Sequence, residues 1–329
     1  MSPIDPKLDP FPLMNGVSTH PLEDRDSLVS LEQFCRVPEP NDGFGEFFDA
    51  LPDILAGAQL KELVDRIVAA KLGGHPVALA LGAHVLKVGL APLIIDLMRR
   101  GIVDHVAMNS AGTIHDFEIA VCGRTSEDVA VELPRGRFGF AEETGAGLAR
   151  AVARGLAPRD GEAAGFGLGV GRLLIEEEAK HREHSVCAEA ARLGVSTSVH
   201  ACIGTDIVHM HPDCDPAAIG LASHLDFRRV CGFVHGMGGG VWINVGSAVV
   251  LPEVFLKAVS VALNLGADLE ESTTANLDMI RQYRAETNVV RRPPGHGISI
   301  IGQHEVLLPV LRSALLSRLS DAGWEAKTS

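Results

Sequence analysis

Apolar residues along this chain follow two different spacings in turn, and the alternation predicts strands and helices. Four short runs bounded by turn residues are predicted to be strands, at residues 77–81, 103–108, 196–202 and 241–245. Around them, apolar residues recur every three or four positions, as in amphipathic helices. This spacing predicts helices over residues 51–68, 90–100, 142–154, 172–193, 217–235 and 251–264, one opening at 117–121, and a final one after 306.

Strands that alternate with helices form βαβ units, which build parallel sheets. We therefore expect an α/β fold with a doubly wound, mostly parallel sheet and helices on both faces. Residues 1–44 are rich in Pro, Asp and Gly and are predicted to be an N-terminal extension; residues 45–329 are predicted to form a single domain. A hydrophobic fraction of 46% with few aromatic residues suits a sheet built from Val, Ile, Ala and Leu.

The net charge limits the possible binding partners, and the cysteine usage limits the cellular compartment. The net charge of −13 argues against nucleic acid and anionic membranes and is compatible with a small cationic substrate. Six scattered cysteines without a CxxC pair indicate reduced thiols. The N-terminus has no apolar leader, and no stretch reaches the roughly 20 apolar residues that a membrane helix needs. We expect a cytoplasmic protein.

The segment Asn109-Ser-Ala-Gly-Thr-Ile-His-Asp-Phe-Glu118 carries the clearest chemistry. It follows the predicted strand at 103–108, so its small residues and its His, Asp and Glu side chains fall at a strand's carboxyl end. Open α/β sheets bind ligands at that edge. The sequence therefore predicts a site there.

This segment, continued to Asp128, resembles the deoxyhypusine synthase family. Three other segments share the resemblance: Leu81-Gly-Ala-His-Val-Leu-Lys-Val-Gly89, Gly204-Thr-Asp-Ile-Val-His209 and Gly238-Gly-Gly-Val-Trp-Ile-Asn-Val-Gly-Ser247. All four occur in the family's order, over roughly residues 45 to 315. The resemblance implies a deoxyhypusine synthase-like NAD-binding fold in a homotetramer, a dimer of dimers with sites shared between subunits. It also implies a transferase, which oxidises spermidine or a similar polyamine with NAD and transfers the aminobutyl group to an acceptor amine, either free or on a protein.

The resemblance also assigns site residues. It implies that Asp116 and Asp206 bind the cationic substrate, that Asn244 stands where the family has a histidine of the catalytic site, and that His115 or His84 moves protons. The implied NAD-binding residues are Asn109, Ala111, Gly112, Gly238, Gly239, Gly240 and Ser247.

One departure from the family bears on the chemistry. The family's nucleophilic lysine lies late in the chain in a Gly-Ser-Asp-rich loop, whereas residues 276–284 and 291–296 here contain no lysine. We considered Lys87 as a substitute catalytic amine, activated by desolvation. The alternative is that Lys87 pairs with a phosphate or a neighbouring acid.

Several signals have a plain structural explanation as well. The glycines of residues 165–171 lack the dinucleotide-loop spacing and favour a helix start, and those of residues 238–240 fit a crowded strand crossing as well as a cofactor contact. Asp116 is equally suited to cap a helix, and Asp206 to lie in a solvated loop. The donors His181, His184, His200, His209, His211 and Cys214 match no standard zinc spacing, so we expect no metal site.

Three functions stay open at this stage. The first is the NAD-dependent aminobutyl transfer described above. The second is NAD-dependent oxidation, deamination or condensation of a small amine or amino acid without a protein acceptor, which the missing lysine favours. The third is a non-catalytic, NAD-binding oligomeric protein.

Overall fold

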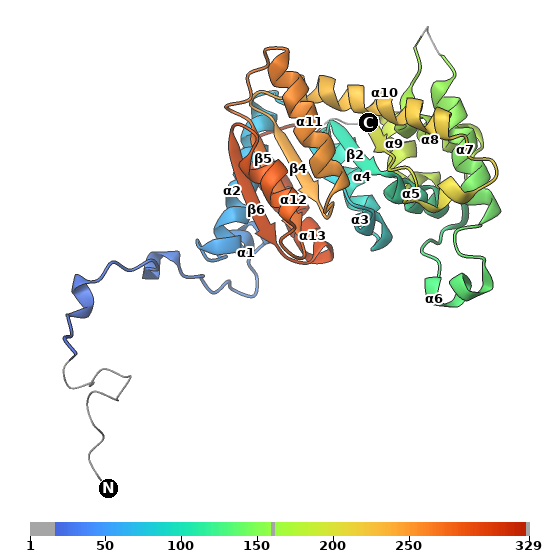
Figure 1. Cartoon of the computed structure of the whole chain (residues 1–329). Coiled ribbons are helices and arrows are strands. Elements are labelled where there is room, and N and C mark those ends of the chain that lie inside the picture. Colours follow the sequence, from blue (N-terminus) through green and yellow to red (C-terminus); the bar gives the residue numbers. More distant parts are fainter. Residues whose placement is uncertain (1–16, 159–161, 327–329) are drawn as a thin grey trace, which may run out of the picture.

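The computed structural model describes residues 17–158 and 162–326, and its centre is one sheet of six parallel strands (Figure 1). The strand order is β3-β2-β1-β4-β5-β6. This confirms the predicted doubly wound α/β fold. The strands are β1 (Val77–Leu81), β2 (His105–Asn109), β3 (Ser196–His200), β4 (Val241–Val245), β5 (Thr273–Asp278) and β6 (His296–Ile301).

Helices connect the strands and cover both faces of the sheet. None of the described helices has the length and apolar composition needed to cross a bilayer. The α-helices are α1 (Phe44–Asp49), α2 (Leu55–Leu72), α3 (Ala83–Lys87), α4 (Ala91–Arg99), α5 (Ser110–Cys122), α6 (Val129–Glu132), α7 (Glu142–Leu156), α8 (Gly165–Glu176), α9 (Val186–Leu193), α10 (Pro216–His235), α11 (Val250–Asn264), α12 (Tyr283–Ala285) and α13 (His304–Asp321). The shorter turns are the 3₁₀ helices η2 (Leu22–Asp24), η3 (Leu31–Gln33), η4 (Leu133–Arg135), η5 (Arg182–His184) and η6 (Ile207–Met210), and the π-helix η7 (Glu286–Arg291).

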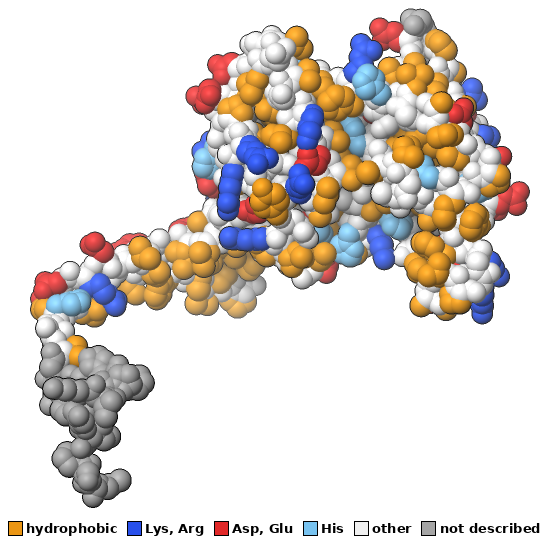
Figure 2. All heavy atoms as spheres, in the orientation of Figure 1, with side chains coloured by type: hydrophobic (Ala, Val, Ile, Leu, Met, Phe, Trp, Pro, Cys, Tyr) orange, Lys and Arg blue, Asp and Glu red, His pale blue; other side chains and the backbone are white. Residues whose placement is uncertain are grey.

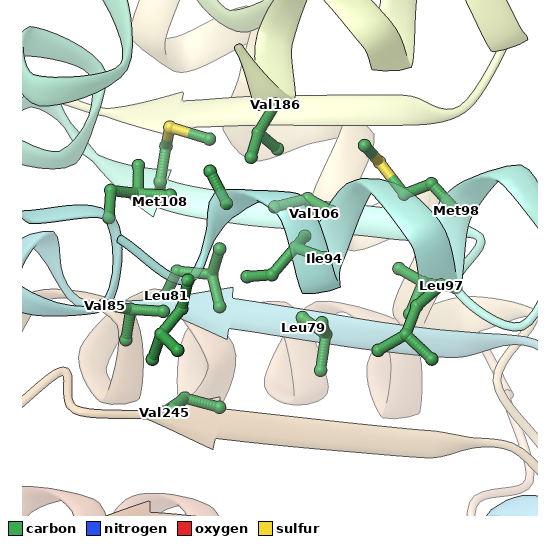
Figure 3. Packing of buried hydrophobic residues seen from close by; sticks show 14 of the residues in the cluster. Leu79, Leu81, Val85, Ile94, Leu97, Met98, Val106, Met108, Val186 and Val245 are labelled. Carbon is green, nitrogen blue, oxygen red and sulfur yellow. The ribbon is translucent and has the colours of Figure 1, made fainter. Parts of the chain in front are cut away.

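The two faces of the sheet bury different side chains. Successive residues of a strand point to opposite faces, and in β1 Leu79 and Leu81 belong to one cluster while Ala78 and Ala80 belong to the other. The leucine side packs on α2, α4 and α13. Figure 3 shows Leu79, Leu81 and Val106 of the sheet beside Ile94 and Leu97 of α4.

The alanine side of β1 faces α10 and α11. Small side chains on this face leave room for Trp242, which is fully buried and stacks on Phe255 of α11 with ring centroids 4.5 Å apart. Burying aromatic rings of this size removes a large apolar area from water. Both faces are therefore covered, as a buried parallel sheet requires.

Two strands were not recognised from the sequence. The strand β5 contains Thr273, Thr274 and Asn276, which are all buried, and β6 follows after the short helices α12 and η7. Buried polar residues hide a strand from an analysis based on apolar runs. The final helix α13 begins at His304, slightly before the predicted position.

The single helix predicted over residues 172–193 is wrong. The chain leaves α8 at Glu176, turns at Glu178 with a φ of +49°, and enters α9 only after Ser185. The buried carboxylate of Asp116 accepts hydrogen bonds at the start of α9, which fixes the second helix in its own direction. The glycines of residues 165–171 lie inside α8, as the favoured helical interpretation predicted.

Glycines bring α7 and α8 into backbone contact. A Cβ atom on Gly155 would lie 1.9 Å from the carbonyl oxygen of Gly165, and one on Gly169 would lie 2.4 Å from that of Ala151. Real Cβ atoms do not approach so closely. The two helices therefore pack in one position, beside β3 and the start of α9.

The described part of the N-terminal extension lies apart from the sheet (Figure 1). Two backbone hydrogen bonds tie its end to the body, from the N–H of Arg36 to the carbonyl of Ala50 and from the N–H of Asp53 to the carbonyl of Gln33. Its apolar side chains are exposed, as Figure 2 shows; they are Val17, Leu22, Leu28, Val29, Leu31, Phe34 and Val37.

Candidate functional site

All six strands end at the same edge of the sheet, and the strand order marks one place on it. The chain moves outward from β1 to β2 and β3, then returns to the other side of β1 as β4. The loops after β1 and β4 thus leave in opposite directions. Such a switch point is where open α/β sheets bind ligands.

The two loops touch at the switch point. The N–H of Gly82 donates to the carbonyl of Val245 at 2.8 Å, and a Cβ atom on Gly82 would lie 2.1 Å from the carbonyl oxygen of Gly246. Gly246 has a φ of +65°, a conformation that glycine adopts without strain. Ser247 follows, and its hydroxyl accepts from the N–H of Leu251 in the first turn of α11.

Buried polar atoms without partners gather beside this contact. The ring of His304 is 1% exposed and neither nitrogen has a hydrogen-bond partner within residues 17–158 and 162–326. The ring of His84 lies 5.9 Å away, and Asp278 at the end of β5 has one unpartnered carboxylate oxygen. Burial lowers the pKa of His304 and raises the pKa of Asp278. His304 and Asp278 were not predicted as site residues, because β5 and β6 were not recognised from the sequence.

A cleft of about 250 Å³ lies over the neighbouring strand ends, between α3, α5, the loop before α6 and η6. Three carboxylates and one lysine line it, Glu118, Glu127, Asp206 and Lys87. The excess of negative charge suits a cationic ligand. Four predicted site residues line this cleft: Lys87, Ala111, His115 and Asp206. A fifth, His84, lies one turn before Lys87 on α3.

His115 is the first of a chain of hydrogen-bonded groups. Its Nδ1 lies 2.6 Å from the hydroxyl of Thr125, which donates to Glu118 at 2.6 Å. Thr144 donates to the other oxygen of Glu118 at 3.0 Å. Burial lowers the pKa of His115, an effect that Glu118 opposes and Lys87 reinforces.

Asp206 is held at the other side of the cleft. Its carboxylate accepts a hydrogen bond from Ser110, the first residue of α5, and it begins η6. His209 accepts from the N–H groups of Gly204 and Asp206, so its ring orders this loop. Within the described residues, no three His, Cys, Asp or Glu side chains are placed to hold a metal ion.

Asp116 faces away from the cleft. The helix α5 begins at Ser110, earlier than predicted, so positions 116 and 118 point to different sides. Asp116 is 1% exposed and accepts from the hydroxyl of Ser185 at 2.5 Å and from the N–H of Val186 at 2.7 Å. Burial raises its pKa. These contacts stabilise the start of α9. Asp116 therefore acts as a helix cap, which was the alternative to substrate binding, but it caps α9 and not its own helix α5.

The position of Lys87 differs from the one predicted for a buried catalytic amine. Its side chain is exposed at the rim of the cleft, whereas the prediction assumed a desolvated amine. Two predicted cofactor residues shape the helix start instead of the cleft: Asn109 caps α5 by accepting from the N–H of Gly112 at 2.9 Å, and Gly112 packs near Ala83.

Asn244 lies in a buried polar row beneath the switch point. In register across three strands, Asn244 pairs with Asn276 and Asn276 with Ser299. The amide of Asn244 donates to the side chain of Asn276 at 2.8 Å and to the carbonyl of Ser247 at 3.0 Å, and Glu286 bridges Asn276 and Ser299. Asn244 therefore supports the loop after β4 from below.

Gly238, Gly239 and Gly240 lie at the opposite edge of the sheet. They precede β4, and a Cβ atom on Gly240 would lie 2.4 Å from the carbonyl oxygen of Pro76, just before β1. The structure therefore separates them from the other predicted cofactor residues. The crowded turn here is the alternative that the sequence analysis left open.

The strand order and the switch point define the class: a doubly wound α/β fold with the Rossmann strand order. No protein-family model matches the sequence, and no curated protein is similar to it in sequence. Solved structures share the fold. AgrE, in a ternary complex with ornithine and NAD+, superposes with a TM-score of 0.52 at 14% identity, over 82% of this chain and 34% of AgrE.

Two further structures are similar. A conserved putative LOR/SDH protein from Methanococcus maripaludis S2 gives a TM-score of 0.51 at 14% identity, over 82% of this chain and 71% of that one. A putative deoxyhypusine synthase from Entamoeba histolytica has a TM-score of 0.49 at 10% identity, over 88% of this chain and 97% of that one. This chain spans about a third of AgrE. The likenesses to AgrE and to the LOR/SDH protein establish the fold, and membership of the deoxyhypusine synthase family stays a prediction.

Proposed function

We propose that this protein binds NAD at the switch point between β1 and β4 and oxidises a small cationic amine or amino acid in the adjoining cleft. The observation that carries the proposal is the position of an acid-lined cleft next to the switch point of a Rossmann-ordered sheet. AgrE, whose structure with ornithine and NAD+ has this fold over part of its length, supports the same pairing of cofactor and substrate class.

The residues at the switch point fit a dinucleotide. Gly82 and Gly246 let two backbones meet without side chains between them, and Ser247 stands at the start of α11, where helix N–H groups favour a phosphate. The unpartnered buried atoms of His304 and Asp278 are groups that a polar ligand would satisfy. When bound there, NAD would accept a hydride from the substrate carbon.

The cleft residues define the substrate. Asp206 and Glu127 offer carboxylates to an ammonium group, and Glu118 adds a third negative charge to the cleft. Lys87 is the only described lysine that lines this cleft, and it is exposed. We therefore place oxidation without a protein-lysine intermediate first, and aminobutyl transfer from a polyamine to an acceptor amine second.

The test has two stages. Calorimetry with NAD alone measures cofactor binding, and absorbance at the NADH band then follows mixtures of protein, NAD and ornithine, arginine, agmatine, putrescine, spermidine or homospermidine. NADH formation with one of these amines supports the oxidation and identifies the substrate. Binding of NAD without NADH formation across the panel contradicts the oxidation and favours the non-catalytic alternative; no binding of NAD contradicts the whole proposal.

A further inference from the structure

The hydrogen bonds around His115 determine which ring nitrogen carries its proton. A carboxylate only accepts hydrogen bonds, so in the 2.6 Å contact between Thr125 and Glu118 the threonine hydroxyl is the donor. That hydroxyl has a single hydrogen. In its 2.6 Å contact with His115, Thr125 must therefore accept, and Nδ1 of His115 must donate.

We propose that Thr125 and Glu118 hold neutral His115 as the Nδ1–H tautomer, which makes its Nε2 the proton acceptor for the substrate amine in the cleft. This inference rests on the proposed function and names the base of that site. His115 lines the cleft, and Nε2 has no hydrogen-bond partner among the described residues. Thr125 and Glu118 are positioning residues because they act through the imidazole.

The surroundings support a neutral imidazole with a charge-stabilising partner. Burial lowers the pKa of His115, which leaves the ring uncharged and able to accept a proton at neutral pH. Glu118 lies three residues further along α5, on the same face, and Thr144 fixes its second oxygen at 3.0 Å. Once Nε2 is protonated, the nearby carboxylate stabilises the imidazolium.

The proton transfer balances on its own. An N–H bond of the substrate ammonium breaks, its electron pair stays on the amine nitrogen, and the proton bonds to Nε2 of His115. Only the uncharged amine can then lose a hydride from its carbon and become an iminium. The relay from His115 to Glu118 moves no further proton.

The tautomer can be measured without cofactor or substrate. Solid-state ¹⁵N NMR of the full chain labelled at histidine distinguishes the two tautomers, and loss of a signal in His115→Gln assigns His115. We expect the Nδ1–H form in the wild type, a switch to the Nε2–H form in Thr125→Val, and the wild-type form in Thr125→Ser, which keeps the hydroxyl. Thr287→Val, on the π-helix η7, is the matched control and leaves the His115 signal unchanged.

The second measurement is steady-state kinetics with the amine of the test panel that forms NADH. We expect Thr125→Val to lower kcat/KM at least tenfold and to flatten the limb of the pH profile that reports the base, and Thr125→Ser to restore both. A wild-type protein in the Nε2–H form overturns the inference whatever its activity. A correct tautomer in a protein that oxidises no amine overturns the proposed function while the assignment of the tautomer stands.

Discussion

Gly82 and Gly246 meet so closely that a single methyl group on Gly82 would lie 2.1 Å from the carbonyl oxygen of Gly246. This contact joins the loops after β1 and β4, the two neighbouring strands that lead to opposite halves of the sheet. It fixes the floor of the proposed cofactor site.

We expect Gly82→Ala to lower the free energy of unfolding by roughly 1–3 kcal/mol, the usual cost of forcing an extra carbon into a packed site. The displaced loops should also weaken NAD binding. Urea unfolding and calorimetry measure the two effects. Gly220→Ala is the matched control, because nothing lies within 4 Å of its Cβ position in α10 and alanine favours helices. Equal stability of Gly82→Ala and the wild type would contradict the close contact.

The carboxylate of Asp206 should bind the ammonium group of the substrate. Asp206→Asn removes one charge from the cleft and keeps a group that can accept from Ser110. Because a hydrogen bond to a charged group contributes about 1.5–3 kcal/mol, we expect KM for the amine to rise roughly 10- to 100-fold.

Steady-state kinetics across amine concentrations measure this change. Asp213→Asn, at an exposed aspartate outside the cleft, is the control and should leave KM unaltered. An unchanged KM in Asp206→Asn would assign the cation to another acid of the cleft.

Two buried histidines should make the protein sensitive to acid. His105 and His200 share the hydroxyl of Ser198, each at 3.0 Å, and burial lowers the pKa of each from 6.5 to about 3. A histidine whose pKa is lower in the folded state binds protons more readily when unfolded. The contribution of each histidine to the free energy of unfolding is therefore complete above pH 6.5 and is lost as the pH falls towards 3.

We expect the free energy of unfolding to fall by a few kcal/mol over this window, since one pKa unit corresponds to about 1.4 kcal/mol. Urea unfolding at a series of pH values measures the slope. The double variant His105→Gln and His200→Gln should be less stable at pH 7 and should lose less on acidification. The same slope in both proteins would show that other groups cause the acid sensitivity.

The buried polar row of Asn244, Asn276 and Ser299 should stabilise the fold. Asn276→Ala removes an acceptor from the buried amide of Asn244 and a donor to Glu286. Leaving buried polar groups without partners costs about 1–3 kcal/mol each. Thermal and urea unfolding should show this loss, whereas Asn264→Ala, exposed at the end of α11, should change stability by less than about 0.5 kcal/mol. A loss in both variants alike would argue against a special role for the row.

The central strands could be predicted because their residues are apolar on both faces. Residues 77–81 read Val-Ala-Leu-Ala-Leu and are all buried. The strand β5 could not be found in this way, because Thr273, Thr274 and Asn276 are polar and the side-chain partners of Asn276 lie on η7 and on β4. Only the tertiary structure supplies those partners.

The candidate site was predictable in its location and less so in its orientation. Asn109 to Glu118 do lie at the carboxyl edge, as expected. Which acid faces the cleft depends on where α5 begins, and an early start at Ser110 turns Asp116 inward. Asn109 was an available signal for this start, since asparagine is a favoured N-cap.

The backbone contact between α7 and α8 has a consequence for the substitutions that this chain can accept. Gly155 and Gly169 are fourteen positions apart, and neither tolerates a Cβ atom without moving a helix. Because α8 also packs on β3, an edge strand of the sheet, and on α9, a side chain at either position would displace α8 from both of these neighbours as well as from α7.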